Sequence, residues 1–443
     1  MGIPEQLSLF AAPPIRQPIK KPTKKQTPVQ KARSGTFTDN MKLPVHRWFR
    51  YSAGFSAAWV EDVLQTSHAT AVLDPFVGSG TVCVAADKLG ISSYGVESHP
   101  FVFRLARGKI AWAEGIDSFE IAINNLVESA MKVRERVSVN DTPELITKCY
   151  SDENLHKLYS IKAAYFELSS GWSGPINDLV FLAINSILRT TSCVGTAQWQ
   201  YVLPNKTKSR VTSPYEALTL QAKMMMDDMS FMQNNSEINQ AILLQSDART
   251  LLGVPDKSID LVVTSPPYAN NYDYADATRL EMTFWGEIAS WGDLHESVRQ
   301  YLICSSSQHA SKDKMKLDQL LNDPDVIPIK EELSNVCNEL DEVRKTKGGN
   351  KAYHLMLAAY FGDMAKTFKA LRRVTKAGAT VCLVIGDSAP YGVHAPVERW
   401  FGELALAYGF KSWEFEKIRD RNIKWKNRKH DVLLHEGRLW ING

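Results

Sequence analysis

The sequence predicts an α/β fold in which one largely parallel sheet is interrupted by two helical insertions. Three observations lead to this prediction. A strand pattern, a glycine turn, a helix pattern and a second strand pattern follow one another over residues 71–97, which is the order of a βαβ unit. Further strand patterns appear at 241–245, 259–264 and 380–385. The stretches between them carry apolar residues at helical spacing instead.

The elements of the core can be placed in chain order. Ser56 is a candidate N-cap, because apolar residues follow it at helical spacing up to about residue 66. The βαβ unit then consists of a strand at 71–74, a helix at 81–89 and a strand at 93–97. Towards the end of the chain we expect helices at 353–373 and 397–407, and short strands near Phe415 and at 432–434.

This pattern divides the 443 residues into six parts. At roughly 150 residues per domain, the length suits about three units or one large domain with insertions. We expect a disordered tail at 1–40, core segments at 41–114, 241–289 and 351–443, and helical insertions at 115–240 and 290–350. Insertions on an α/β scaffold often carry specificity.

Composition excludes several classes of protein. With 44% apolar and 23% charged residues, the chain is neither disordered throughout nor a coiled-coil rod. No apolar run approaches the roughly 20 residues that cross a bilayer, and the N-terminus lacks the apolar core of a signal peptide. The six cysteines lie far apart, without a CxxC pair or a histidine cluster that would complete a metal site. We therefore expect a cytoplasmic protein with free thiols, no metal and no membrane contact.

Positive charge is concentrated in the N-terminal tail. Residues 1–35 hold seven Lys and Arg residues against one acid, Glu5, so they carry +6 and the rest of the chain carries −3. Proline and lysine dominate residues 11–35, and apolar residues are too few there to offset the entropy lost on ordering. An extended basic arm favours a polyanionic partner such as nucleic acid.

A short apolar peptide precedes this arm. Gln6, Leu7, Ser8, Leu9 and Phe10 resemble the peptide by which many bacterial proteins dock on the replication sliding clamp. Leu and Phe anchors at the end of a flexible tether suit such docking. A match of five residues also arises by chance, and the sequence leaves both interpretations open.

The first motif with chemical content is Asp74-Pro75-Phe76-Val77-Gly78-Ser79-Gly80-Thr81, which ends a strand and opens a helix. Glycines at such a turn let a ligand approach the backbone, and the helix N-terminus offers free N–H groups. Glu97 closes the next strand, where a carboxylate can accept hydrogen bonds from a ribose. The GxGxxG pattern of dinucleotide sites is absent. The alternative is a tight turn without a ligand.

The second motif is Thr264-Ser265-Pro266-Pro267-Tyr268, directly after the strand pattern IDLVV. Two prolines remove two backbone donors and stiffen the loop. A carbonyl of such a loop can accept a hydrogen bond from an amine, and the aromatic side chain can stack on a flat ring. The alternative is a proline turn with a tyrosine in the core.

Together, DPFVGSGT and TSPPY resemble the motifs of the S-adenosylmethionine-dependent DNA amino-methyltransferases. The serine of SPPY resembles the N4-cytosine type, because adenine enzymes usually carry aspartate at this position. The resemblance covers about residues 45–113, 241–290 and 353–436. It implies a class I (Rossmann-like) methyltransferase fold with a seven-stranded, mostly parallel sheet and a reversed last strand. It also implies a nucleoid-associated enzyme that acts on double-stranded DNA.

The resemblance further implies roles for individual residues. Ser265, Pro266, Pro267 and Tyr268 would form the catalytic loop, with Tyr268 stacked on a flipped cytosine. Glu97 would bind the ribose of S-adenosylmethionine, and Asp247 would accept from its adenine amino group. The remaining cofactor contacts would come from Phe55, Ser56, Asp74, Pro75, Phe76, Gly78, Gly80 and Thr81. The chemistry requires no metal.

Basic runs are the candidate phosphate contacts. These runs include Lys206, Lys208, Arg210, Lys424, Lys426 and Arg428. By the same resemblance, the first insertion would recognise the target sequence. A restriction-modification or other defence system would then need a cognate nuclease or defence subunit as partner, because nothing in the chain resembles a nuclease. Three alternatives stay open at this point: adenine-N6 methylation of DNA, methylation of an RNA amino group, and a DNA-binding subunit that keeps the fold without catalysis.

Overall fold

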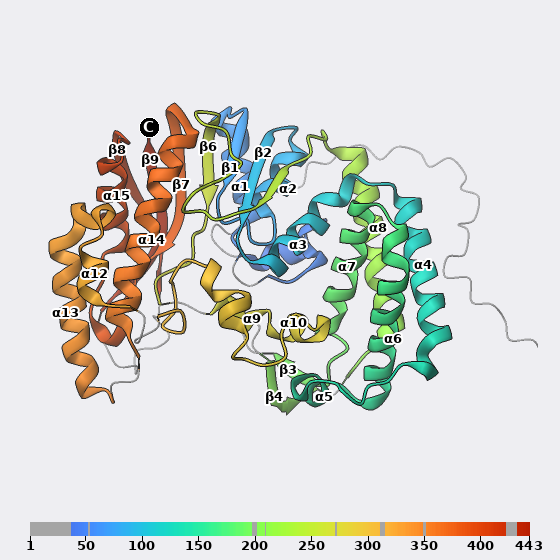
Figure 1. The fold of residues 1–443 in the computed structure, drawn as a ribbon. Coiled ribbons are helices and arrows are strands. Elements are labelled where there is room, and N and C mark those ends of the chain that lie inside the picture. Colours follow the sequence, from blue (N-terminus) through green and yellow to red (C-terminus); the bar gives the residue numbers. More distant parts are fainter. Residues whose placement is uncertain are drawn as a thin grey trace, which may run out of the picture.

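A seven-stranded sheet forms the centre of the computed structural model (Figure 1). The structure describes residues 37–51, 54–196, 202–208, 210–270, 273–310, 315–348, 351–421 and 432–443. The strand order is β5-β2-β1-β6-β7-β9-β8. The strands are β1 (Ala71–Asp74), β2 (Ser92–Glu97), β5 (Ile242–Gln245), β6 (Ile259–Thr264), β7 (Thr375–Gly386), β8 (Ser412–Arg421) and β9 (Leu434–Asn442).

One strand runs against the others. The neighbours from β5 to β7 pair in parallel, whereas β9 is antiparallel to both β7 and β8. The last strand of the chain is therefore the reversed one. The prediction of a seven-stranded, mostly parallel sheet of the class I methyltransferase type is confirmed.

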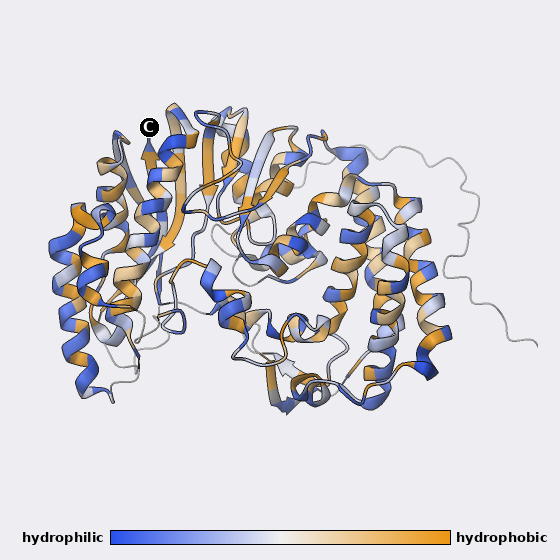
Figure 2. Ribbon diagram, in the orientation of Figure 1, coloured by the Kyte–Doolittle hydropathy of each residue, from blue (hydrophilic) through white to orange (hydrophobic). Residues whose placement is uncertain are grey.

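Alternate side chains of the central strands enter two separate cores. Val72 of β1 packs with helices α1 (Ala57–Ser67) and α2 (Thr81–Lys88), whereas Leu73 packs on the opposite face. That face is covered by α14 (Tyr353–Val374) and α15 (Val397–Ala407). Strands buried on both faces read as continuous apolar runs, and Figure 2 shows this orange colouring. The α2 helix begins directly after the glycine turn, as the sequence predicts.

The first insertion forms a group of packed helices on the α3 side of the sheet (Figure 1). Its helices follow α3 (Pro100–Ile110) and are α4 (Ile116–Val133), α5 (Glu144–Cys149), α6 (Asp152–Leu168), α7 (Gly174–Leu188) and α8 (Pro214–Asn235). A two-stranded hairpin, β3 (Val194–Thr196) and β4 (Val202–Thr207), lies between α7 and α8. The sequence predicted a polar segment there, not a strand.

Helices α9 (Tyr274–Ala277) and α10 (Arg279–Trp285) follow β6 within the core segment 241–289. The second insertion, residues 290–350, contains α11 (Leu294–Ser297), α12 (Leu317–Leu321) and α13 (Lys330–Thr346). Helices α12 and α13 pack against α14 at the other side of the sheet from the first insertion (Figure 1). In the part of the chain that the structure describes, no helix has both the length and the apolar character needed to cross a bilayer.

A buried carboxylate joins the first insertion to the segment before α1. Asp228 of α8 is 2% exposed. Its oxygens accept hydrogen bonds from Val45 N (3.1 Å), Arg47 Nε (2.9 Å) and Trp48 Nε1 (2.9 Å). Gln221 Nε2 of the same helix donates to Trp48 O at 3.0 Å. The segment from 45 to 48 is thus fixed by the insertion.

Candidate active site

The two sequence motifs meet at one cavity with an empty volume of about 700 Å³. It lies at the carboxyl ends of β1, β2 and β6, where ligands bind in open α/β sheets. Its lining includes Phe55, Phe76, Gly78, Thr81 and Glu97 from the cofactor prediction, and Ser265 and Pro267 from the catalytic prediction.

Two glycines shape the first wall of this cavity. Gly78 and Gly80 have φ values of +52° and +87°, a region that side chains with a Cβ rarely adopt. A Cβ on Gly78 would also lie 3.1 Å from the ring of Tyr51. Gly80 is the N-cap of α2 and does not line the cavity itself. Its positive φ lets the chain turn from β1 into α2.

Glu97 is held in a defined orientation. Its Oε2 accepts from Gly78 N and its Oε1 accepts from His99 N, both at 2.9 Å. Each oxygen keeps lone-pair capacity for a further donor. Burial raises the pKa of Glu97 to about 7, although these backbone N–H groups oppose the shift. The N–H groups of Gly78 and His99 therefore fix the orientation of the Glu97 carboxylate before a ligand binds.

Asp74 links the ends of the two central strands. Its Oδ1 accepts from Thr264 Oγ1 at 2.6 Å and from Phe76 N at 3.1 Å. Its Oδ2 is buried and has no hydrogen-bond partner among the described residues. Burial raises the pKa of Asp74 to about 7. Asp74 does not line the cavity, so its predicted contact with the cofactor stays a prediction.

The catalytic loop is fixed from the α14 side of the sheet. Tyr360 Oη of α14 donates to Pro267 O at 2.9 Å. Ser265 Oγ donates to Val384 O of β7 at 3.3 Å, which leaves its lone pairs able to accept. Pro266 is buried, whereas Ser265 and Pro267 line the cavity.

Tyr268 is half-buried beside β7 and does not line this cavity. The guanidinium of Arg421 lies 5.2 Å from the centre of its ring. A Cβ on Gly386 would lie 3.1 Å from that ring, so glycine permits the close packing. Arg421 Nη1 also donates to Asp387 O at 2.8 Å. One face of Tyr268 is thus covered by β8, and its stacking role stays a prediction.

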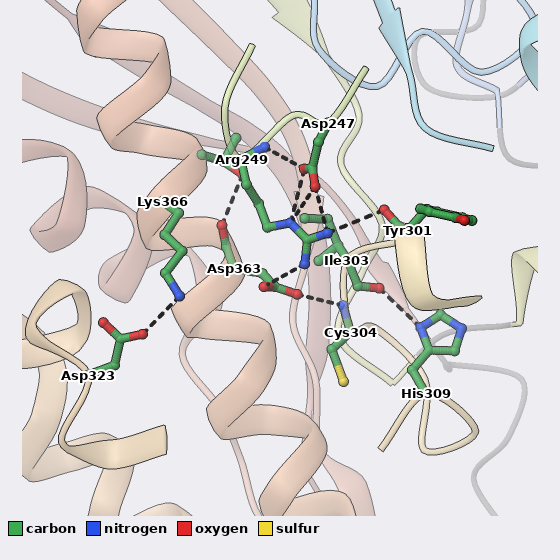
Figure 3. A network of polar contacts seen from close by, with 10 residues as sticks. Asp247, Arg249, Tyr301, Ile303, Cys304, His309, Asp323, Asp363 and Lys366 are labelled. Carbon is green, nitrogen blue, oxygen red and sulfur yellow. Dashed lines mark hydrogen bonds and ion pairs between the residues drawn. The ribbon is translucent and has the colours of Figure 1, made fainter. Parts of the chain in front are cut away.

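Asp247 takes part in a polar network beside the cavity (Figure 3). Arg249 Nε and Nη2 donate to Asp247 Oδ2 at 2.9 and 2.6 Å, while Nη1 donates to Asp363 Oδ1 of α14 at 3.0 Å. Asp363 Oδ2 accepts from Cys304 N at 3.0 Å. Since Ile303 and Ser305 line the cavity, this network positions one of its walls. The predicted contact of Asp247 with adenine stays a prediction.

Other predicted residues lie outside the cavity lining. Ser56 is the N-cap of α1 and accepts from Trp59 N at 3.3 Å, and Pro75 is buried in the turn after β1. Lys206 and Arg210 are exposed, whereas Lys208 is half-buried and its ammonium donates to Arg189 O at 2.5 Å. Two predicted groups lie outside the described residues: Lys424, Lys426 and Arg428, and the peptide Gln6, Leu7, Leu9 and Phe10.

Val77 and Ser79 also line the cavity and lie inside the first motif, and Tyr274 is an aromatic after the second motif that the sequence offers as an assistant to Tyr268. Other lining residues had no place in the sequence prediction. They are Tyr51, Gly54, Ser98, His99, Leu302, Ile303 and Ser305. Ser98 and His99 adjoin Glu97, so their position next to a predicted residue was a usable signal. Leu302, Ile303 and Ser305 come from the second insertion, which carries no motif. Burial lowers the pKa of His99 to about 3, so its imidazole is neutral.

Comparisons with known proteins agree with this arrangement. A family model described as DNA methylase matches residues 14–108, which contain the glycine turn and Glu97. Over 426 residues the chain is 23% identical to the Type II methyltransferase M.BsoBI of Geobacillus stearothermophilus, covering 87% of this chain and 82% of that protein. It is also 23% identical over 401 residues to the Type II methyltransferase M.AvaI of Nostoc sp. (strain PCC 7120), covering 85% and 81%. The sheet order and these matches together support a DNA methyltransferase.

Proposed function

We propose that the chain transfers a methyl group from S-adenosylmethionine to the exocyclic N4 amino group of a flipped cytosine in double-stranded DNA. The observation that carries this proposal is the shared cavity. Gly78 and Glu97 line it from one side, and Ser265 and Pro267 line it from the other. The serine in the SPPY motif favours cytosine over adenine.

The residues present fit the cofactor. Glu97 offers two carboxylate oxygens that are already oriented by backbone N–H groups, which suits the two hydroxyls of a ribose. We also propose Asp74, whose buried Oδ2 lies outside the cavity lining, as a contact of the methionyl ammonium. Phe55, Phe76 and Ile303 supply apolar surface in the same cavity, as cofactor sites usually do. When bound, S-adenosylmethionine supplies a methyl group on a positively charged sulfur.

The catalytic loop supplies the acceptors for the amino group. We assign Ser265 Oγ and the carbonyl of Pro266 to the two N–H bonds of the cytosine N4. Positive charge develops on this nitrogen as its lone pair attacks the methyl group and the bond from that carbon to sulfur breaks. Fixed acceptors stabilise that charge. Tyr360 holds the loop through Pro267 O, so the acceptors need little reorganisation. Positioning alone supplies roughly 7–11 kcal/mol in well-oriented reactions.

A base inside a duplex cannot reach this cavity, so we expect base flipping. Tyr268 is the stacking partner that we propose for the flipped base. We further propose that the first insertion reads the target sequence and that the exposed Lys206 and Arg210 contact phosphates. Because the relatives are named Type II methyltransferases, we propose a restriction-modification context with a separate cognate nuclease.

The product identifies the reaction. Unmethylated duplex DNA is incubated briefly with the protein and S-adenosylmethionine, digested to nucleosides and analysed by mass spectrometry, with Ser265→Ala as the slow control. N4-methylcytosine is the expected product. N6-methyladenine as the sole product, or methylation of RNA alone, would replace the proposed substrate. Cofactor binding without methylation of any DNA tested would favour the non-catalytic DNA-binding subunit.

We also propose the sliding clamp as a partner of residues 6–10. Deleting residues 1–12 should abolish co-elution of the protein with the clamp and leave methylation of short duplexes unchanged. Replacing Leu9 and Phe10 by alanine is the matched point-variant test. Co-elution that survives both changes would exclude this peptide as the docking site.

A further inference from the structure

Side chains of metal-binding type from three elements meet just beyond the carboxyl end of β7, outside the lining of the main cavity. Asp387 follows β7, Glu398 lies in the first turn of α15, and His435 belongs to β9. One ligand atom of each residue lies within 4.8 Å of the other two. His394 Nε2 lies at the edge of this group, 3.5 Å from Asp387 Oδ2.

The backbone brings these side chains together. Asp387 N donates to His435 O at 3.0 Å, so the two residues are neighbours across β7 and β9. Helix α15 packs against both strands, and His435 Nε2 lies 3.7 Å from Glu398 Oε1. Ligand atoms of a tetrahedral zinc ion, with bonds of about 2.0–2.2 Å, are about 3.4 Å apart. Small side-chain rotations therefore suffice to bring the three groups onto one ion.

The burial of Asp387 is a separate observation that points to a cation. This residue is 2% exposed, and neither of its carboxylate oxygens accepts a hydrogen bond from the described residues. His435 Nδ1 lies 2.7 Å from Oδ2 without the alignment of a hydrogen bond. Among the described residues, the charged contacts of the Asp387 carboxylate are with histidine and not with Lys or Arg. A buried carboxylate without a donor or a permanent counter-charge is costly.

Glu398 adds a second acid at the same place. Burial and the neighbouring Asp387 carboxyl group raise the pKa of Glu398 above its usual range. The two carboxyl groups therefore need either a shared proton or a cation between them. Imidazole nitrogen combined with carboxylate oxygen suits zinc, whereas Mg²⁺ and Ca²⁺ prefer oxygen ligands alone.

We propose that Asp387, Glu398 and His435 bind one zinc ion that links β7, α15 and β9, with His394 or a water molecule as the fourth ligand. The role of this ion is structural. Methyl transfer as proposed above uses no metal, so the inference does not rest on that function. The site adjoins the support of the catalytic loop, because Arg421 Nη1 donates to Asp387 O at 2.8 Å.

Zinc uptake by the full-length protein tests the proposal. The purified protein is treated with a chelator, separated from it and titrated with ZnCl₂ in a calorimeter, with MgCl₂ as the comparison ion. We expect one zinc ion per chain with a Kd of about 1 μM or below, and no binding of Mg²⁺ at that concentration. At a 100-fold excess over Kd, zinc should raise Tm by about 3 °C, because it binds the folded state alone.

Variants of the ligands locate the ion. His435→Gln and Glu398→Gln should each weaken zinc binding by about 100-fold or more, since even the outer-shell partners of metal ligands contribute about 10- to 100-fold. The visible d–d absorption of bound Co²⁺ should be lost in both variants. His156→Gln on α6 and Glu403→Gln, farther along α15, are the matched controls and should bind zinc as the wild type does.

Two results would overturn the proposal. A wild type that takes up zinc only at millimolar concentration would leave the two carboxyl groups sharing a proton. Unchanged zinc affinity in both ligand variants would place the ion elsewhere. If the variants do not fold, anomalous scattering from wild-type crystals grown with one equivalent of zinc replaces them: a peak between Asp387 and His435 supports the site, and a peak only elsewhere overturns it.

Discussion

The two sides of the main cavity are held in place in different ways. On the glycine-turn side, the contacts are local: Glu97 accepts from Gly78 N and His99 N, which lie within 19 residues of it in the chain. On the catalytic-loop side, the contacts are remote: Tyr360 reaches Pro267 O across 93 residues, and Ser265 reaches Val384 O across 119.

This difference indicates which side of the cavity determines cofactor binding and which determines turnover. The contacts that orient Glu97 need only one βαβ unit, so this side can hold a ligand that is common to many enzymes. The remote side depends on α14, β7 and β8, which belong to the last third of the chain. We therefore expect changes on the first side to affect cofactor binding and changes on the second side to affect turnover.

The largest expected effect is the loss of cofactor affinity caused by a substitution in the glycine turn. Gly78→Leu places a side chain at a φ of +52° and against the Tyr51 ring, so we expect cofactor affinity to fall by about 100-fold or more. Isothermal titration calorimetry measures this loss. Gly171→Ala is the matched control, because a Cβ there meets no atom within 4 Å. Unchanged affinity in Gly78→Leu would show that the turn does not contact the cofactor.

Substitutions in the catalytic loop should lower turnover and leave cofactor affinity nearly unchanged. Ser265→Ala and Tyr268→Ala are each expected to lower kcat by about 100-fold, in the range seen when one fixed polar group is removed from an active site. Cofactor affinity should stay within about twofold of the wild type. Single-turnover methylation of a short duplex gives the rate, and calorimetry gives the affinity. Full activity of Tyr268→Ala would show that Tyr268 does not stack on the flipped base.

The pH dependence of cofactor binding sharpens the comparison further. The pKa values of Glu97 and Asp74 are both about 7, so both carboxyl groups lose charge as the pH falls below 7. A cationic ligand with ribose hydroxyls favours the ionised forms. Affinity should therefore rise between pH 5.5 and 7, by up to about tenfold per pH unit for each carboxylate.

Glu97→Gln provides the internal test of this dependence. The variant should bind the cofactor more weakly at pH 7 and keep only the smaller pH dependence due to Asp74. Calorimetric titrations across this pH range measure both effects. An identical pH profile in the variant and the wild type would contradict the assignment of Glu97 to the ribose.

The smallest effect is expected from the network of Figure 3. Asp363→Asn weakens the contacts to Arg249 and Cys304 N, which position Ile303 and Ser305. We expect KM for the cofactor to rise by about tenfold, since a lost hydrogen bond to a charged group costs about 1.5–3 kcal/mol at most. kcat should stay near the wild-type value. Asp341→Asn, which breaks an ion pair on α13, is the matched control and should leave KM unchanged.

The sequence predicted the local side of the site more completely than the remote side. Strand β1 and the start of α2 lie where the motif predicts them, because the glycines and the flanking apolar runs act over a few residues. The wall formed by Leu302 and Ile303 was not predicted. Its position depends on Asp363, which lies 59 residues from Cys304 in the chain, and no local pattern encodes that contact.

Two strands show why local patterns failed elsewhere. β4 contains Pro204, which predicts a loop, but a two-stranded ribbon tolerates a residue without an N–H donor. The short strand expected at 432–434 is wrong except for its last residue: β9 begins at Leu434 and runs to Asn442, because it pairs with β7 on one side and β8 on the other. Gly437 interrupts its apolar pattern, and a Cβ there would lie 2.3 Å from the Phe415 ring.

The Asp228 contacts have a consequence for engineering. Val45, Arg47 and Trp48 are tied to α8, and a few residues later Tyr51 and Phe55 line the main cavity. The first insertion is thus not a transferable module: a chimera that exchanges it for that of a relative must carry residues 43–56 from the same donor. Grafting the helices alone would leave the Asp228 carboxylate or its donors without a partner and displace the cavity wall that Tyr51 and Phe55 form.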